Sequence, residues 1–457
     1  MTLVPRPVSF AAGEGTVEHG VVETLFVDGP PQGYRLTVSP GGTVIEASDE
    51  AGEFYAYQTI RQLIGPDAFR VASIDRTPTM LPVCTIEDYP RFPWRGCMID
   101  VARHFVPKHD LLRYVDLLSV HKLNVLHLHL TDDQGWRFEV KRYPKLTSVG
   151  GWRSSSRYGD RRSGGRTGRP HGGFYTQDDL REIFEYARQR HVLVIPEIDV
   201  PGHSQAAIAA YPALGVHGGD VWTDWGVNER VLNTEESTVD FYRNVFDELI
   251  DVFPSEVIGI GGDEAPGHDG SFVRQIAQHL VRRGRRPYGW DEIVAAGPLP
   301  AGTIVASWRG ISGGVTAARD GHDVVMCPEE FVYLDYRQSS REDEPIPVGT
   351  VTTVEDVYGW EPMPASLTGA EPGRVLGAQA NLWTEHLDSP RRLDYAAFPR
   401  LAAFAEVVWS PREKDPGFLD RLAAHHLPRL DALGVEYRPL AGPLPWQTMP
   451  GVPGFPR

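Results

Sequence analysis

The chain has 457 residues, which is long for one compact domain, and we expect one large unit together with a smaller one. A formal net charge of -16 argues against nucleic-acid binding, because contacts to phosphates need clustered Lys and Arg. No run approaches the ~20 apolar residues that a membrane-spanning helix requires, so we expect no membrane partner.

The cysteines and the first residues bear on where the protein works. Cys84, Cys97 and Cys327 are few and odd in number, so we expect no disulfide framework and a reducing compartment. Residues 1–7 lack the basic start and apolar core of a secretory signal. We therefore expect a cytoplasmic protein, with a secretory leader removed beforehand as the alternative.

Residues 1–88 are predicted to form a small α+β domain. Leu36–Ser39 and Thr43–Ala47 predict two strands joined by a Gly-rich turn. A helix is expected over about Glu53–Ile64. The segment Asp88–Trp94 contains two prolines and is typical of a linker into the next unit.

From Arg95 onward, short apolar runs alternate with longer amphipathic segments. Residues 111–118 and 239–253 repeat apolar side chains at helical spacing, and Thr176 with Asp179 predicts a capping box at the start of another helix. The apolar runs are eight in number: Cys97–Val101, Asn124–Leu130, Val192–Asp199, Val257–Gly262, Pro287–Trp290, Thr303–Trp308, Asp323–Cys327 and Gly377–Trp383.

Eight predicted strands that alternate with helices favour an α/β fold of the (β/α)8 TIM barrel type. A doubly wound open sheet is the alternative, but it would need a Gly-rich phosphate-binding turn after its first strand, where Asp100, Arg103 and His104 stand instead. We therefore expect the N-terminal α+β domain at 1–88, a catalytic barrel at 91–440 and a Pro-rich C-terminal tail at 441–457.

Polar residues stand at the ends of most of the predicted strands. The carboxyl ends of barrel strands form the active site in such folds, so these residues should lie together. Packing alone does not require so many polar groups there, and carboxylates beside several Trp are typical of a carbohydrate site. They are Asp100 and Arg103, Asp132 and Asp133, Asp199 and His203, Asp263 and Glu264, Trp290 and Asp291, Trp308, Tyr333 and Asp335, and Trp383 and Glu385.

Asp263 and Glu264 are the candidates for the chemistry. Cleavage of a glycoside needs an acid for the leaving oxygen and a second group that meets the oxocarbenium-like charge. We expect burial and neighbouring carboxylates, above all Asp263, to raise the pKa of Glu264. The alternative is a solvated loop start, but Gly261 and Gly262 allow close backbone approach and an apolar strand leads in, which favours catalysis.

Three histidines have two interpretations each. His203 with Asp199 could form a carboxylate–His pair that modulates Glu264, or it could be structural. His127 and His129 alternate onto one face of their strand, a pattern that also binds metals. Because no further His stands at the fifth, sixth or eighth strand end, we expect hydrogen bonding within the barrel and no metal.

Two aromatic and basic features remain. Trp290, Trp308 and Trp383 suit either the core or the apolar faces of a sugar and its amide methyl group. The Arg- and Gly-rich residues 161–173 follow no strand directly, so we expect a mobile loop over the site and not an anion cradle.

Six motifs carry a family resemblance. They are Asp100-Val-Ala-Arg-His-Phe, His127-Leu-His-Leu-Thr-Asp-Asp-Gln-Gly-Trp-Arg, Pro196-Glu-Ile-Asp-Val-Pro-Gly-His, Ile260-Gly-Gly-Asp-Glu, Tyr333-Leu-Asp and Asn381-Leu-Trp-Thr-Glu. In this order, between residues 90 and 410, they resemble glycoside hydrolase family 20, the β-N-acetylhexosaminidases. The N-terminal unit is also similar to the family's small α+β domain.

The resemblance implies a retaining, substrate-assisted mechanism without a cofactor, in which the acetamido oxygen of the substrate attacks the anomeric carbon and forms an oxazolinium intermediate. Glu264 would donate the proton and later activate water, and Asp263 would orient the acetamide and balance its charge. The other implied roles are Tyr333 on the acetamide oxygen, Trp290, Trp308 and Trp383 around its methyl group, Arg103, Asp335 and Glu385 on sugar hydroxyls, and Asp132, Asp199 and His203 in support of Glu264.

The expected partner is a small-molecule or oligosaccharide substrate with a terminal N-acetylhexosamine, and the oligomeric state is not predicted. The alternatives are a lacto-N-biosidase, a relative that prefers sulfated hexosamines, a non-catalytic sugar-binding protein on the same fold, and a metal hydrolase. The long Arg-rich stretch between Trp152 and Phe174 departs from the family pattern and leaves the preferred leaving group open.

Overall fold

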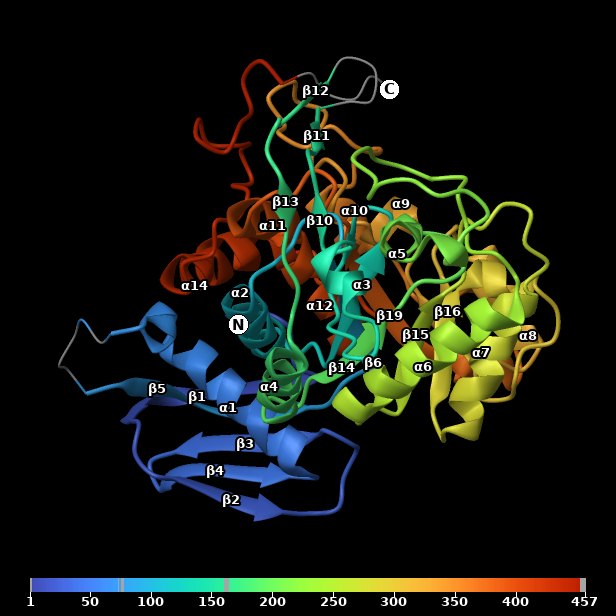
Figure 1. Ribbon diagram of the computed structural model, residues 1–457. Coiled ribbons are helices and arrows are strands. Elements are labelled where there is room, and N and C mark those ends of the chain that lie inside the picture. Colours follow the sequence, from blue (N-terminus) through green and yellow to red (C-terminus); the bar gives the residue numbers. More distant parts are fainter. Residues whose placement is uncertain (1, 73, 75–77, 160–163, 453–457) are drawn as a thin grey trace.

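The computed structural model describes residues 2–72, 74, 78–159 and 164–452 and shows two packed units (Figure 1). A small sheet with one long helix, drawn in blue, lies against one side of a closed barrel. In the described part of the chain, none of the helices has both the length and the apolar character needed to cross a membrane.

The N-terminal unit is a five-stranded sheet in the order β1-β5-β3-β4-β2, packed against helix α1. β3 and β4 form the predicted antiparallel pair, with Ser39 opposite Gly42 at the turn. α1 begins earlier than predicted, because the Asp49 side chain accepts a hydrogen bond from the amide of Gly52 and caps the helix. The bounds are β1 Ser9–Glu18, β2 Val22–Phe26, β3 Tyr34–Ser39, β4 Gly42–Ala47, α1 Glu50–Ile64, the 3-10 turn η1 Pro66–Phe69 and β5 Met80–Asp88.

The second unit is a closed barrel of parallel strands in the order β14-β15-β16-β17-β18-β19-β6-β7. Each of the eight predicted runs overlaps one of these strands, so the predicted TIM barrel is confirmed. Every residue of β6, β7 and β15 is buried, as expected for strands covered on both faces. The bounds are β6 Trp94–Asp100, β7 Val125–His129, β14 Leu193–Glu197, β15 Val257–Gly261, β16 Arg286–Trp290, β17 Ile304–Ser307, β18 Asp323–Met326 and β19 Val375–Leu382.

Helices surround the barrel and cover its outer face (Figure 1). α4 begins with the predicted capping box, in which the side chains of Thr176 and Asp179 each accept from the other's amide. The described link between β16 and β17 contains only the 3-10 turn η3, Asp291–Val294, in place of a longer helix. The helices are α2 Lys108–Val120, α3 Lys145–Ser148, α4 Gln177–Arg188, α5 Gln205–Ala210, α6 Glu236–Val252, α7 Ser271–Arg282, α8 Ser312–Arg319, α9 Glu329–Val332, α10 Val354–Gly359, α11 Pro390–Ala397, α12 Arg400–Trp409, α13 Phe418–Arg421 and α14 Leu427–Ala432.

Buried polar contacts join the two units. Lys122, just beyond α2, places Nζ 2.7 Å from Oδ2 of Asp88 at the end of β5. Trp409, at the end of α12, donates its indole N–H to the other oxygen of Asp88 at 2.9 Å and packs into the core of the N-terminal sheet. The barrel and the sheet are therefore held together by groups that are out of contact with water.

Candidate active site

The ends of the barrel strands enclose a cavity of about 240 Å³. Nine of the twelve predicted site residues line it, which agrees with the expectation that strand ends converge. They are Arg103, His203, Asp263, Glu264, Trp308, Tyr333, Asp335, Trp383 and Glu385, and they are joined by Glu329, Tyr336 and Val348.

The other three predicted residues lie outside this lining. Asp132 and Asp199 are buried beside it, each with 1% of its surface exposed. Trp290 is also 1% exposed, because the last side chain of β16 turns into the barrel and packs with Trp383, with ring centroids 5.9 Å apart. In this structure Trp290 therefore supports Trp383 and does not form a wall of the cavity.

The backbone before Asp263 passes very close to Asp199. Gly261 and Gly262 have φ of 64° and 93°, which side chains rarely tolerate, and a Cβ on Gly261 would collide with the Asp199 carboxylate. The amide of Gly262 donates to Oδ1 of Asp199 at 3.0 Å. The predicted close approach is confirmed, and it holds Asp263 and Glu264 at the rim.

His203 bridges the two candidate carboxylates. Its Nε2 lies 3.4 Å from Oε2 of Glu264 and 3.7 Å from Oδ2 of Asp263. Its Nδ1 lies 3.3 Å from Oδ1 of Asp132 on the opposite side. Burial lowers the pKa of His203, but Asp132, Asp133 and Glu264 outweigh burial and raise it well above the ordinary value. His203 is therefore a cation between carboxylates.

The two candidate carboxylates differ in pKa in the direction opposite to the one expected. Burial raises the pKa of Glu264, but the hydrogen bond and charge of His203, helped by Arg103, outweigh it and leave a lowered value. Burial, together with the charge of Asp199, raises the pKa of Asp263 well above its usual range. The expected rise in the pKa of Glu264 is thus wrong for the ligand-free protein. The His203 cation, which comes from another strand end, lowers this pKa by more than burial raises it.

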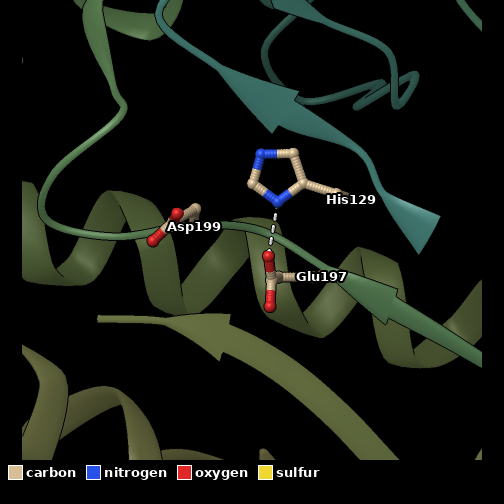
Figure 2. Close-up of side chains that lie close together, drawn as sticks. All are labelled: His129, Glu197 and Asp199. Carbon is tan, nitrogen blue, oxygen red and sulfur yellow. Dashed lines mark hydrogen bonds and ion pairs between the residues drawn. The ribbon is translucent and has the colours of Figure 1, made fainter. Parts of the chain in front are cut away.

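A buried network extends beneath this pair. Figure 2 shows His129 of β7 above Glu197 at the end of β14, with Asp199 two residues further along. His129 places Nδ1 2.5 Å from Glu197 and Nε2 2.8 Å from Asp132, and His127 reaches the other oxygen of Glu197 at 3.1 Å. The predicted hydrogen-bonding role of His127 and His129 is confirmed.

The pKa values in this network indicate which of its groups carry protons. Burial lowers the pKa of His129, but the bonds to Asp132 and Glu197 outweigh it and raise the value to about 10. Burial would raise the pKa of Glu197, but His127 and His129 outweigh it and lower the value to about 2. Both ring nitrogens of His129 therefore donate to carboxylates.

Three groups of side chains place possible metal ligands close together. They are His129 with Glu197 and Asp199, Asp132 with Asp133 and His203, and Asp199 with His203 and Asp263. A histidine that carries both ring protons has no lone pair for a metal ion. In the arrangement without an ion, the raised pKa values of His129 and His203 indicate that both rings hold protons between carboxylates.

Aromatic and charged side chains complete the walls. Trp308 and Tyr333 stack with centroids 6.2 Å apart, and the Tyr333 ring lies 6.2 Å from that of Trp383. Arg103 packs over Trp383 and binds Asp132 at 2.8 Å. Flat rings beside carboxylates and a guanidinium are suited to the apolar and hydroxyl-bearing faces of a sugar.

Two buried carboxylate oxygens of the cavity, Oδ1 of Asp263 and Oδ1 of Asp335, have no hydrogen-bond partner among the described residues. Burial and the charge of Glu385 raise the pKa of Asp335 well above its usual range. Buried polar atoms are normally paired, so these two oxygens identify positions where a ligand with N–H or O–H groups would bind.

Comparison with known families identifies the family of this chain. The model of the glycosyl hydrolase family 20 catalytic domain matches residues 92–270 and 268–412, and that of domain 2 of the same family matches residues 5–89. The chain belongs to glycosyl hydrolase family 20. The resemblance drawn from six motifs is confirmed.

Relatives of known name agree with this membership. A beta-hexosaminidase of Porphyromonas gingivalis is 38% identical over 92% of this chain, and a beta-N-acetylhexosaminidase of Cellulomonas fimi is 37% identical over 94%. The chain spans 56% of the length of the first protein and 86% of the second.

Solved structures of the family are similar along nearly the whole chain. A mutant Streptomyces plicatus beta-hexosaminidase in complex with the product GlcNAc has a TM-score of 0.85 and 31% identity, and the match covers 95% of this chain and 96% of that one. The family 20 beta-N-acetylhexosaminidase from Streptomyces coelicolor also has a TM-score of 0.85 and 31% identity, with 97% and 98% covered.

The sequence missed several residues around the family 20 site. Tyr336 donates its hydroxyl to Glu329 at 2.5 Å, and both line the cavity. Glu292 accepts the indole N–H of Trp308 at 2.9 Å. Glu292 directly follows Asp291 at a strand end, and Tyr336 lies three residues after Tyr333, so inspecting the neighbours of the predicted residues would have found them.

The Arg-rich stretch is a β-hairpin in its described part. β10, Trp152–Arg153, pairs with β13, His171–Gly172, and further out β11, Arg157–Tyr158, pairs with β12, Gly165–Arg166. The hairpin projects at the top of Figure 1. Arg157 and Arg166 both pair with Asp224, and residues 161–163 of the expected mobile loop lie outside the described residues. The described part is thus ordered by ion pairs.

Proposed function

We propose that this family 20 protein is an exo-acting β-N-acetylhexosaminidase, which hydrolyses terminal β-linked N-acetylhexosamine residues with retention of configuration. The observation that carries the proposal is the pair Asp263 and Glu264, bridged by His203 at the rim of an aromatic cavity. The printed names of the relatives and the GlcNAc complex of the Streptomyces plicatus enzyme support it.

The shape and lining of the cavity favour action at a chain end. A volume of about 240 Å³ suits one sugar unit and not a bound chain. Arg103, Asp335 and Glu385 are placed to bind ring hydroxyls, while Trp308 and Trp383 offer apolar faces to an acetamide methyl group. A terminal N-acetylhexosamine presents both kinds of surface.

In the proposed first step, the acetamide oxygen of the substrate attacks the anomeric carbon and the bond to the leaving oxygen breaks. Glu264 gives its proton to that oxygen, so the leaving group departs as an alcohol. The resulting oxazolinium ion carries a positive charge, which the Asp263 carboxylate balances, and the Tyr333 hydroxyl donates to the acetamide oxygen while it attacks. In the second step Glu264 takes a proton from water, whose oxygen attacks the same carbon. The bond between that carbon and the acetamide oxygen breaks, which restores the acetamide and the original configuration.

Substrate binding explains how Glu264 acquires its proton. In the ligand-free site the pKa of Asp263 is raised and that of Glu264 is lowered, so a proton favours Asp263. An acetamide N–H that donates to Asp263 stabilises its ionised form and lowers its pKa. The proton is then available to Glu264, either directly or through His203, which lies between the two carboxylates.

Replacing the acid tests the proposal. Glu264→Gln should lower turnover of an N-acetylglucosaminyl disaccharide by about 10²–10⁴-fold, because an alkoxide leaving group needs a proton. A 4-nitrophenyl substrate, whose leaving group is already acidic, should lose much less in its first step. Exposed Glu256, at the opposite end of β15, gives a matched control as Glu256→Gln. Near-full activity of Glu264→Gln on the disaccharide would refute the assignment.

A substrate panel separates the alternatives within the family. N-acetylglucosaminides, N-acetylgalactosaminides, a sulfated hexosaminide and a lacto-N-biosyl glycoside each differ in one feature of the non-reducing end. We expect the simple N-acetylhexosaminides to be cleaved fastest, since the cavity has room for one sugar. No hydrolysis of any of them would favour a sugar-binding protein without catalysis.

A further inference from the structure

A second and larger cavity adjoins the site. It measures about 650 Å³ and shares Glu264 with the smaller cavity, so the proposed proton donor stands in the wall between them. The loop after β15 and the short link after β16, which includes η3, form part of its lining. A glycosidic oxygen protonated by Glu264 has one sugar in the smaller cavity, and the leaving group must extend to the other side.

The larger cavity, called the acidic cavity below, is lined by more carboxyl groups than cationic groups. Glu229, Glu264, Asp269 and Glu292 line it, against a single guanidinium, that of Arg309. The Arg309 charge is already matched, since its Nε lies 2.8 Å from the buried carboxylate of Asp291, which does not line the cavity, and 3.6 Å from Glu292, which does. The imidazole of His268 is also engaged, at 3.0 Å from the carbonyl oxygen of Leu232.

Glu292 lies between the two cavities. One of its oxygens accepts the indole N–H of Trp308, which belongs to the smaller cavity, while the side chain also lines the acidic cavity. Burial, together with the charge of Asp263, raises the pKa of Glu292 to about 8. A cation in the acidic cavity would stabilise the ionised form of Glu292.

The lining has no Trp, Tyr or Phe ring among the described residues. Neutral sugars are commonly bound by stacking on such rings, so this cavity lacks the usual means of holding one. Its selectivity must come from charge and hydrogen bonding, and its charge is negative.

We propose that the acidic cavity receives the leaving group and favours a leaving sugar that carries a free, protonated amine. The preferred substrate class is then an N-acetylhexosamine linked to an unacetylated hexosamine, ahead of the same linkage to an N-acetylated sugar, with anionic leaving sugars last. This rests on the proposed hexosaminidase function and specifies the substrate of that site.

Three matched disaccharides test the preference. Each has N-acetylglucosamine at the non-reducing end in the same β-linkage, and the leaving sugar is glucosamine, N-acetylglucosamine or glucuronic acid. For the wild-type protein at neutral pH, kcat/KM should fall in that order, by about two- to fivefold per step, the range of partly exposed ion pairs. Raising the salt concentration should narrow the differences. Equal rates, or faster cleavage of the glucuronic acid compound, would overturn the proposal.

Variants locate the effect in the cavity. Glu229→Gln and Asp269→Asn each remove one charge, and Asn at 269 keeps an oxygen for the Ser271 amide that Asp269 now caps. Each should reduce the ratio of kcat/KM for the glucosamine compound to that for the N-acetylglucosamine compound. Asp220→Asn, an equal charge change in the same segment as Glu229 but outside the cavity, should leave the ratio unchanged. An unchanged ratio in both cavity variants would show that the preference does not arise in the acidic cavity.

Different results would refute the hexosaminidase function and the role of the acidic cavity. If no N-acetylhexosaminide of any kind is cleaved, the hexosaminidase function itself is wrong. If a 4-nitrophenyl N-acetylglucosaminide is cleaved well but the three disaccharides show no order, only the role of the acidic cavity is wrong.

Discussion

Asp199 and Gly261 show how a buried contact positions a pair of carboxylates at the rim. The chain turns immediately after β15 with Gly261 at φ 64°, directly against the Asp199 carboxylate. The sequence allowed the close approach to be predicted from two successive glycines. It did not identify Asp199 as the group approached, because that contact joins two strands distant in sequence.

Gly261→Ala should therefore cost more stability than backbone strain alone would. A Cβ there meets a carboxylate that cannot move freely, so we expect a loss of stability of about 1–3 kcal/mol and a large loss of kcat. Gly284→Ala is the matched control, since Gly284 has φ 73° but open space around its Cβ. Chemical unfolding and steady-state kinetics measure both. Similar costs for the two variants would show that the contact with Asp199 is unimportant.

His203 should control the pH dependence of the reaction. Its positive charge, 3.4 Å from Glu264, favours the ionised carboxylate and lowers the pKa of Glu264. Neutral His203→Gln removes that charge, so the pKa of Glu264 rises and the acid stays protonated to higher pH. The high-pH limb of the kcat/KM profile should then move to higher pH by about one pH unit or more. In addition, kcat should fall because the side chain that bridges Asp263 and Glu264 is lost.

A pH–rate profile of the variant and the wild type checks this, with the exposed histidine in His109→Gln as control. A limb that stays in place or moves to lower pH would show that His203 does not set the protonation of Glu264. Sequence alone predicted His203 as a partner of Glu264 but not the direction of the pKa shift. That direction depends on distances among side chains from four strand ends.

Between elements, a buried pair of histidines connects α2 with the π turn Leu422–His426. Nε2 of His121 lies 2.9 Å from Nε2 of His426, and both rings are buried. Burial lowers the pKa of His121 to about 4, and burial together with the charge of His121 lowers that of His426 well below its ordinary value. Neither ring is charged at neutral pH.

This pair should make the protein sensitive to acid. Unfolded histidines titrate near 6.5, so the unfolded state binds more protons between about pH 6.5 and pH 4, and stability is lost as pH falls through that window. The loss from His121 alone is on the order of 3 kcal/mol. Melting temperatures measured from pH 7 to pH 4 should fall less steeply in His426→Gln than in the wild type or in His109→Gln. Parallel curves would contradict the role of the pair.

The elements themselves could be predicted to different degrees. The eight barrel strands are mostly apolar and almost wholly buried, so they stand out in the sequence, and Thr176 marks the start of α4 through its cap. The hairpin of β10–β13 was missed because its strands are two residues each and have no periodic pattern. It depends on Asp224, which lies about sixty residues away in the chain.

For the whole molecule, the N-terminal unit is fastened to the barrel by a buried ion pair. Lys122 has 2% of its side chain exposed and Asp88 none, and Tyr34 and Trp409 contact them. No pattern in the sequence links these residues, because the partners belong to different units and each resembles an ordinary surface residue.

Asp88→Asn should therefore destabilise the entire protein. It leaves the Lys122 ammonium buried without a counter-charge, and breaking such a pair costs about 3–5 kcal/mol. Because the pair spans both units, sheet and barrel should unfold in one transition at lower denaturant concentration. Asp67→Asn, which breaks the exposed pair with Arg70, should change stability by less than about 1 kcal/mol. Two separate transitions, or equal costs, would contradict the interlocked arrangement.

The most direct test of the proposed chemistry is a series of 4-nitrophenyl glucosaminides whose N-acyl group carries zero, one, two or three fluorine atoms. Fluorine withdraws electrons from the acyl oxygen and weakens it as a nucleophile without altering the leaving group. If Asp263 assists a nucleophile that belongs to the substrate, kcat/KM should fall steeply and in order along the series. If kcat/KM is the same along the series, a protein carboxylate attacks the anomeric carbon, and the division of roles between Asp263 and Glu264 is wrong.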